Sequence, residues 1–75
     1  MTIREVRQKH GLTRKAAAYA LSFAGPDGAV ADRDLVNYEF GRCKPHYYLA
    51  LYMAQQSGFP GEWGRAALAQ FYGRN

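Results

Sequence analysis

Four side chains in the segment 32–40 could contact the edges of base pairs. The guanidinium group of Arg33 could donate two hydrogen bonds to guanine O6 and N7, and the amide of Asn37 could pair with adenine N6 and N7. The carboxylate of Asp32 could accept a hydrogen bond from cytosine N4, and Val36 could touch the methyl group of thymine. Base recognition of this kind requires one rigid element that presents all four side chains together.

A short helix over residues 32–40 is the element that would position them. At helical spacing, Leu35, Tyr38 and Glu39 fall on one side, and the four candidate base contacts lie away from it. Gly41 is placed to end the helix, because glycine enters the left-handed region without a Cβ penalty. A buried back combined with a polar outer side is what a DNA recognition helix needs.

A second set of residues, mostly cations, could contact phosphate. Positive side chains and helix N-termini both favour anions, and contacts to phosphate add affinity without reading sequence. Two of these residues lie in the loop after the expected helix, and three gather at the start of an earlier one, where a threonine would also act as the N-cap. The candidates are Thr13, Arg14, Lys15, Arg42 and Lys44.

Each candidate also has a purely structural interpretation. Asp32 and Asp34 would stabilise the positive end of the helix dipole, and Arg33 and Asn37 would be solvated surface residues. Arg42 and Lys44 would only keep the loop after this helix solvated. Phe40 projects away from the expected core, toward DNA, a neighbouring loop or a second subunit.

The remaining sequence predicts four more helices. Thr2 and Glu5 have the spacing of a capping box, and Pro45 suits the first turn of a helix, where its missing N–H costs nothing. Residues 24–28, with the turn tripeptide Pro-Asp-Gly, and residues 57–61 are expected loops. Five short helices predict an all-α bundle. Their expected ranges are 3–10, 14–23, 32–40, 45–56 and 62–72.

Composition limits the class of protein. A chain of 75 residues that is 48% apolar predicts one folded domain. The net charge of +4 favours polyanionic partners such as nucleic acid. The single cysteine, Cys43, cannot form an internal disulfide, which suits a reducing cytoplasm. No apolar run approaches the roughly 18 residues of a membrane span, and the N-terminus lacks the apolar core of a signal peptide. We therefore expect a cytoplasmic protein without membrane contact.

Catalysis and metal binding are not indicated. Neither His10 nor His46 has a second histidine four residues away, and no glycine-rich phosphate loop or Ser-His-Asp set is apparent. Cys43 alone cannot build a zinc site. We expect no enzyme activity, no cofactor, no metal and no small-molecule effector.

Several of these residues together carry a family resemblance. The segment Val6–Thr13 has an arginine four residues before a glycine, Ala18 is a small residue within the second expected helix, and a Leu-x-x-Tyr-Glu-x-Gly-x-x-x-Pro pattern follows. Over about residues 3–56, the chain resembles the phage repressor/Cro (Xre-like) helix-turn-helix family of DNA-binding proteins. The pattern residues are Leu35, Tyr38, Glu39, Gly41 and Pro45.

The resemblance implies a structural ion pair between the first and third helices, here Arg7 with Glu39. It also implies a helix-turn-helix formed by the second and third helices. This chain departs from the pattern in two places. Ser22 replaces the usual glycine after the second helix and about six or seven extra residues follow Phe23, which gives an enlarged turn; Ala17 stands where the family prefers leucine.

These expectations define a single helix-turn-helix domain over residues 1–75. Its function would be that of a sequence-specific double-stranded DNA-binding regulator from a phage, plasmid or other mobile element, acting as a repressor by occupying an operator. It would bind as a homodimer with half-sites about one helical turn apart. The expected dimer surface is the helix 62–72 with the end of the helix before it, through Trp63, Phe71 and Tyr72.

A protein-interaction function is the alternative. A small adaptor or inhibitor would use an aromatic surface and would not bind DNA. Tyr47, Tyr48 and Tyr52 could belong to such a surface, although tyrosines at helical spacing are more often core residues. RNA binding is a third, weaker possibility. The salt dependence of duplex binding separates the first two functions, because only contact with phosphate releases counterions.

Overall fold

The computed structural model describes residues 1–25 and 30–73. Within them the chain forms α-helices and no β-strand, which confirms the all-helical expectation. The predicted turn Pro26-Asp27-Gly28, and with it the course of the enlarged connection, lies outside the described residues. The helices are α1 (Ile3–Lys9), α2 (Arg14–Ala24), α3 (Asp32–Glu39), α4 (Tyr47–Ala54) and α5 (Gly58–Tyr72).

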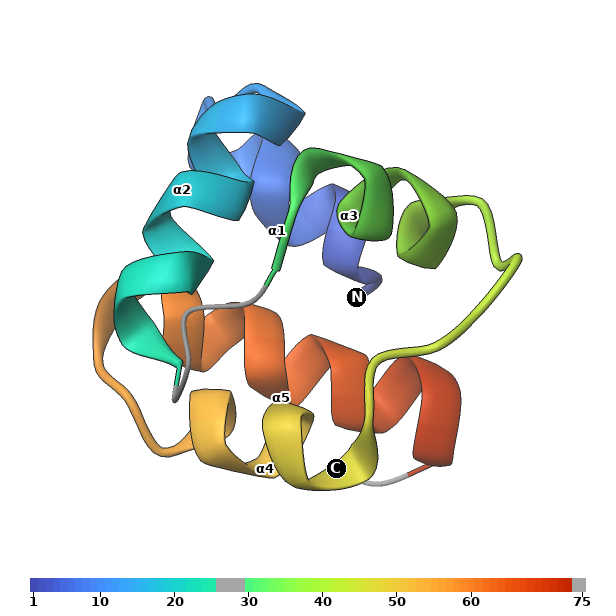
Figure 1. Cartoon of the computed structure of the whole chain (residues 1–75). Helices are drawn as coiled ribbons and strands as arrows, with labels where there is room; N and C mark the ends of the chain where they lie inside the picture. The colour runs from blue at the N-terminus through green and yellow to red at the C-terminus, as the bar shows by residue number, and fades with distance from the viewer. Residues whose placement is uncertain (26–29, 74–75) are drawn as a thin grey trace.

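The helices form two layers. In Figure 1, α4 and α5 lie side by side as the lower layer, and α1, α2 and α3 form the upper one. The start of α1 is attached to the far part of α5, because the amide of Ile3 donates a hydrogen bond to Oε1 of Gln70 at 2.9 Å. After α3 the chain descends along one side of the molecule to α4 (Figure 1). Among the described residues, no helix is long and apolar enough to cross a bilayer.

Local capping signals set the first helix boundaries. The predicted capping box is present: the Glu5 amide donates to Oγ1 of Thr2 at 3.1 Å, and the Thr2 amide donates to Oε1 of Glu5 at 2.8 Å. Thr13 caps α2, since its hydroxyl accepts a hydrogen bond from the Ala16 amide at 3.1 Å. Gly11, with φ of 68°, takes the left-handed conformation just after α1. Two side-chain caps therefore fix where α1 and α2 begin.

Trp63 is the largest side chain of the core and is completely buried. It comes from α5 and reaches the ring of Tyr38 on α3, with the two ring centres 6.4 Å apart. Every described helix contributes fully or almost fully buried side chains to the same cluster. Burial of this apolar surface is the main favourable term for so small a domain. The cluster includes Ile3, Val6, Leu21, Val30, Leu35 and Met53.

A glycine allows α4 and α5 to approach closely. A Cβ atom at Gly64 would lie 2.3 Å from the backbone nitrogen of Ala54 and 2.7 Å from the backbone oxygen of Ala50. Neither backbone atom can turn aside as the end of a side chain could. Position 64 therefore admits only glycine at this helix separation.

The structure corrects the predicted starts of the last two helices. α4 begins at Tyr47 rather than at Pro45, because the His46 ring caps it by accepting a hydrogen bond from the Tyr48 amide at 3.2 Å. α5 begins at Gly58, so the segment 57–61 is largely helix and not the expected loop. Pro60 occupies the first turn of α5, where no intrahelical N–H bond is lost. The glycines and proline that suggested a loop are accommodated in this turn.

Candidate nucleic-acid interface

The carboxylate of Glu39 connects α1 to α3. It accepts hydrogen bonds from Nε of Arg7 at 2.6 Å and from Nη2 at 3.1 Å, so the pair is bidentate. Arg7 also donates from Nη1 to the backbone oxygen of Leu12 at 2.9 Å. The Glu39 side chain is 1% exposed and that of Arg7 10%. The structure thus contains the Arg7–Glu39 pair that the family resemblance implied, and it fixes the inner side of α3.

A second arginine joins the same carboxylate. Nε of Arg14, the first residue of α2, lies 3.1 Å from Oε1 of Glu39. From the sequence, Arg14 is predicted only as a phosphate contact, and this second role was not predicted. Linear spacing does not separate Arg14 from Lys15 as a partner for Glu39, because the packing of α2 on α3 decides which cation reaches it. Three helices therefore meet at one buried negative charge.

The outer side of α3 carries the four predicted base contacts with unequal exposure. Asp32 and Arg33 are exposed, whereas Val36 and Asn37 are partly buried. Asp34 is partly buried and its carboxylate accepts a hydrogen bond from the Ala31 amide at 3.4 Å, so it acts as a helix-start acid. The first turn of α3 is the most accessible part of the candidate base-reading surface.

Lys15 belongs to the same region as the start of α3. A shallow groove between α2 and α3 is lined by Lys15 and Tyr19 on one side and by Val30, Ala31 and Asp32 on the other. Lys15 is exposed and has no hydrogen-bond or ion-pair partner within the described ranges. The groove brings one predicted phosphate contact next to one predicted base contact.

Phe40 lies between the other two arginines of the interface. It follows α3 as its C-cap and is 55% exposed. The Cζ atoms of Arg14 and Arg42 lie 5.5 Å and 5.4 Å from the centre of its ring, which is the range of a cation–π contact. Helical spacing predicts only that Phe40 points away from the core. Its position beside both cations was not predicted.

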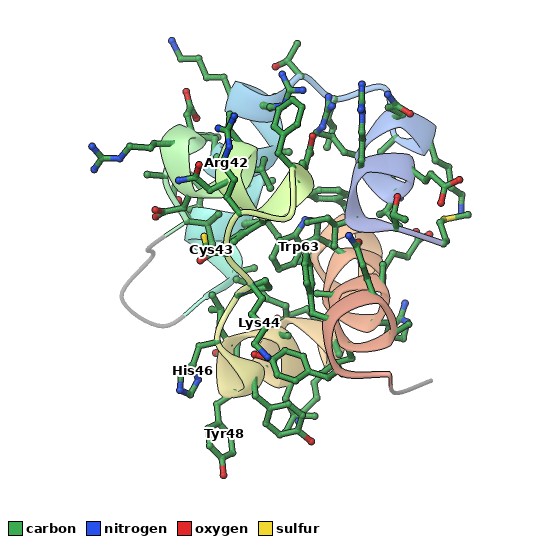
Figure 2. All side chains as sticks on the ribbon, turned by 90° about the vertical axis from the view of Figure 1, so that its right-hand side faces the viewer. Arg42, Cys43, Lys44, His46, Tyr48 and Trp63 are labelled. Atoms are coloured by element: carbon green, nitrogen blue, oxygen red, sulfur yellow. The ribbon has the colours of Figure 1, made fainter. Side chains whose placement is uncertain are left out.

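The loop after α3 separates the two cations that the sequence analysis grouped. In Figure 2, Arg42 lies beside α3, while Lys44 lies lower, near α4 and α5. Nζ of Lys44 is 4.8 Å from the centre of the Tyr72 ring, and the Tyr72 hydroxyl donates to the backbone oxygen of Pro45 at 2.7 Å. Lys44 is therefore held against the end of α5 and does not join Arg14 and Arg42 beside Phe40.

Trp63 corrects the predicted dimer surface. Because it is fully buried, with its ring near that of Tyr38 on α3, it cannot contact a second subunit in this fold. Phe71 and Tyr72 are partly buried; Phe71 packs on the core and Tyr72 bonds to the loop after α3. The large exposed aromatic side chains lie instead on α2 and α4 or follow α3. They are Tyr19, Phe23, Phe40, Tyr48 and Tyr52.

Titratable groups near the interface add little chemistry of their own. Burial raises the pKa of the Tyr38 hydroxyl, and the nearby Asp34 carboxylate raises it further, so Tyr38 stays neutral at physiological pH. Cys43 is exposed in the loop and is unpaired. Within the described part of the chain, no group of three potential metal ligands comes together. The arrangement is suited to binding an anion through fixed cations.

Comparison of the chain with protein-family models, with curated proteins and with solved structures found no match.

Proposed function

We propose that this chain binds double-stranded DNA in a sequence-specific manner through α2 and α3 and regulates transcription as a repressor. The proposal rests on one observation above others. The Glu39 carboxylate holds α3 by its inner side to α1 and α2, which leaves Asp32 and Arg33 accessible on the outer side. A recognition helix must be fixed to its scaffold in this way, because base contacts need a defined orientation.

Phosphate contacts would come from both ends of α3. Lys15 lies near its start, whereas the N-terminus of α2, which Thr13 caps, lies toward its end together with Arg14. Arg14 and Arg42 lie near its end, around Phe40. Cations at both ends would set the register of the helix in the major groove, while Asp32, Arg33, Val36 and Asn37 supply base contacts. Lys44, held at α5, would reach only a more distant phosphate.

Regulation would follow from occupancy of an operator by a homodimer. A single domain of this size makes few base contacts, and a second copy doubles them. With Trp63 in the core, the homodimer would use exposed side chains, and sedimentation of the free protein would establish the oligomeric state. The proposed mechanism needs no cofactor, metal or small-molecule effector.

The experiment that tests this function begins with selection of bound sequences from a random duplex pool. Anisotropy titrations on the selected duplex should then give tight binding that weakens steeply with salt. Arg33→Ala or Asn37→Ala should cost about 1–3 kcal/mol of binding energy and relax preference at particular base pairs. Arg4→Ala is the matched control, since it removes one exposed positive charge from α1. Unchanged preference in both α3 variants would refute the base-reading assignment.

A companion pair of variants tests the phosphate contacts. Arg42→Ala or Lys44→Ala should weaken binding to all duplexes about equally and lower the salt slope by about one unit each. A loss confined to one sequence would mean that the residue reads bases.

Exposed aromatic side chains support the alternative, an adaptor or inhibitor without DNA binding. Tyr19 and Phe23 on α2 are 67% and 76% exposed, and their rings form an edge-to-face pair with centres 4.8 Å apart. A pair of this kind could anchor a protein partner. Such a protein would select no duplex from the pool and would show no salt-dependent duplex binding.

A further inference from the structure

The ring of Phe40 lies close to two positive charges, only one of which also pairs with a carboxylate among the described residues. Arg14 and Arg42 come from different elements, the start of α2 and the loop after α3, yet both guanidinium groups lie within cation–π distance of this one exposed ring. Two positive charges beside the same ring repel each other unless other groups compensate. The arrangement therefore indicates a site prepared for a negative charge.

Among the described residues, the only carboxylate that pairs with these two arginines is already engaged. Glu39 accepts two hydrogen bonds from Arg7 and one from Arg14, and its side chain is 1% exposed. Arg42 has no side-chain hydrogen bond or ion pair within the described residues. Positive charge thus exceeds negative charge around Phe40, and the excess lies on the exposed side.

The donors that remain are of the kind that bind a phosphodiester. Arg14 uses Nε for Glu39, so its Nη groups stay available, and its side chain is 35% exposed. Stacking on a ring leaves the hydrogen-bonding edge of a guanidinium group free, and that edge forms paired hydrogen bonds with phosphate oxygens. Preorganised donors of this kind lose less side-chain entropy on binding than flexible ones.

We propose that Phe40 positions Arg14 and Arg42 as a two-arginine clamp on the phosphate backbone of nucleic acid. The clamp rests on the proposed DNA-binding function. Within that function, Phe40 would position the two arginines, although it carries no charge and contacts no base. Phe40 acts through the arginines and touches no base. Ring stacking orients the two guanidinium groups before the phosphate arrives.

The test compares Phe40→Leu with the control Phe40→Tyr in anisotropy titrations on several duplexes at one salt concentration. Leucine keeps the apolar bulk but removes the π face, whereas tyrosine keeps it. We expect Phe40→Leu to bind every duplex about fivefold to tenfold more weakly, the size expected for two exposed cation–π contacts, and Phe40→Tyr to bind within about twofold of the original chain. The salt slope should stay the same in both variants, because both arginines remain.

A second comparison, in a protein that lacks both arginines, tests whether Phe40 acts through them. In the Arg14→Ala/Arg42→Ala protein, Phe40→Leu should cause no further loss, because the groups that it positions are gone. Equal binding by Phe40→Leu and the original chain overturns the clamp, and so does a loss that differs between duplex sequences. Greater weakening on single-stranded than on double-stranded DNA would mean that the ring stacks on bases, which also overturns it. If the original chain binds no duplex at any salt concentration, the proposed function itself fails, which is a distinct result.

Discussion

At Glu39 three helices meet through charge, whereas at Gly64 two helices meet because one residue has no side chain. The Glu39 carboxylate collects Arg7 and Arg14 from α1 and α2 in a nearly water-free position. Gly64 instead lets α5 lie directly against the backbone of Ala50 and Ala54 on α4. The first contact is directional and fixes the orientation of α3; the second is close packing and fixes only a distance. The candidate interface lies at the directional contact, the one at Glu39.

The largest expected effect comes from removing the charge at the centre of the polar contact. Glu39→Gln should lower the free energy of unfolding by about 3–5 kcal/mol, because Arg7 is left poorly solvated without a counter-charge. Arg7→Met should cost less, about 2–3 kcal/mol, since Arg14 still pairs with Glu39. The double variant should recover part of the loss. Thermal melts of the four proteins measure this, and strictly additive losses would contradict pairing.

The close contact between α4 and α5 at Gly64 should be nearly as sensitive to mutation. Gly64→Ala forces α4 and α5 apart, because the new Cβ atom would meet backbone atoms at 2.3 and 2.7 Å. We expect a loss of about 2–3 kcal/mol in urea unfolding. Gly11→Ala is the control, because a Cβ there meets nothing within 4 Å and adds only the strain of a φ of 68°. That control should cost about 1–2 kcal/mol. An unchanged Gly64→Ala protein would show that the helix contact is not tight.

Arg14 should contribute much less to stability than Arg7 does. Its side chain is 35% exposed, so solvent screens its attraction to Glu39, and Arg14→Met should lower the free energy of unfolding by about 0.5–1 kcal/mol. Duplex binding by the same variant should weaken clearly. A stability loss as large as that of Arg7→Met would mean that Arg14 is structural and not part of the interface.

The smallest effect is expected at the exposed pairs between α1 and α5. Glu62 bonds to Nζ of Lys9 at 2.7 Å and to Nε2 of His10 at 2.8 Å, and these two hydrogen bonds lower the pKa of its carboxyl from its ordinary value. A lowered pKa in the folded state adds stability above the unfolded value, and the gain disappears as pH falls through the folded one. Melts of Glu62→Gln and the original chain should differ slightly at pH 7 and coincide at low pH. A difference that persists in acid would contradict this assignment.

Local signals in the sequence predicted part of this structure. The Thr2–Glu5 box and the Thr13 cap gave the starts of α1 and α2, because a cap involves residues only a few positions apart. The helical spacing of Leu35 correctly predicted its burial on the inner side of α3. The start of α5 was missed because Gly58 and Pro60 usually break helices, although a proline in the first turn loses no intrahelical hydrogen bond.

The candidate site was predictable to a smaller extent. The Arg7–Glu39 pair came from a family resemblance. The addition of Arg14 to that pair and its contact with Phe40 depend on how α2 packs on α3, which no local spacing encodes. The burial of Trp63 was also missed, because an aromatic residue near a chain end is equally compatible with a core and with an interface.

The position of Trp63 has a consequence for measurement. It is the single tryptophan of the chain, it is fully buried, and its ring lies 6.4 Å from that of Tyr38 on α3. Its fluorescence emission should therefore shift to longer wavelength only when the two helix layers separate and water reaches the indole. A ligand bound at the outer side of α3 should leave that emission nearly unchanged, because Trp63 is fully buried. The chain thus contains an optical probe that distinguishes a variant that has lost its ligand from one that has lost its fold.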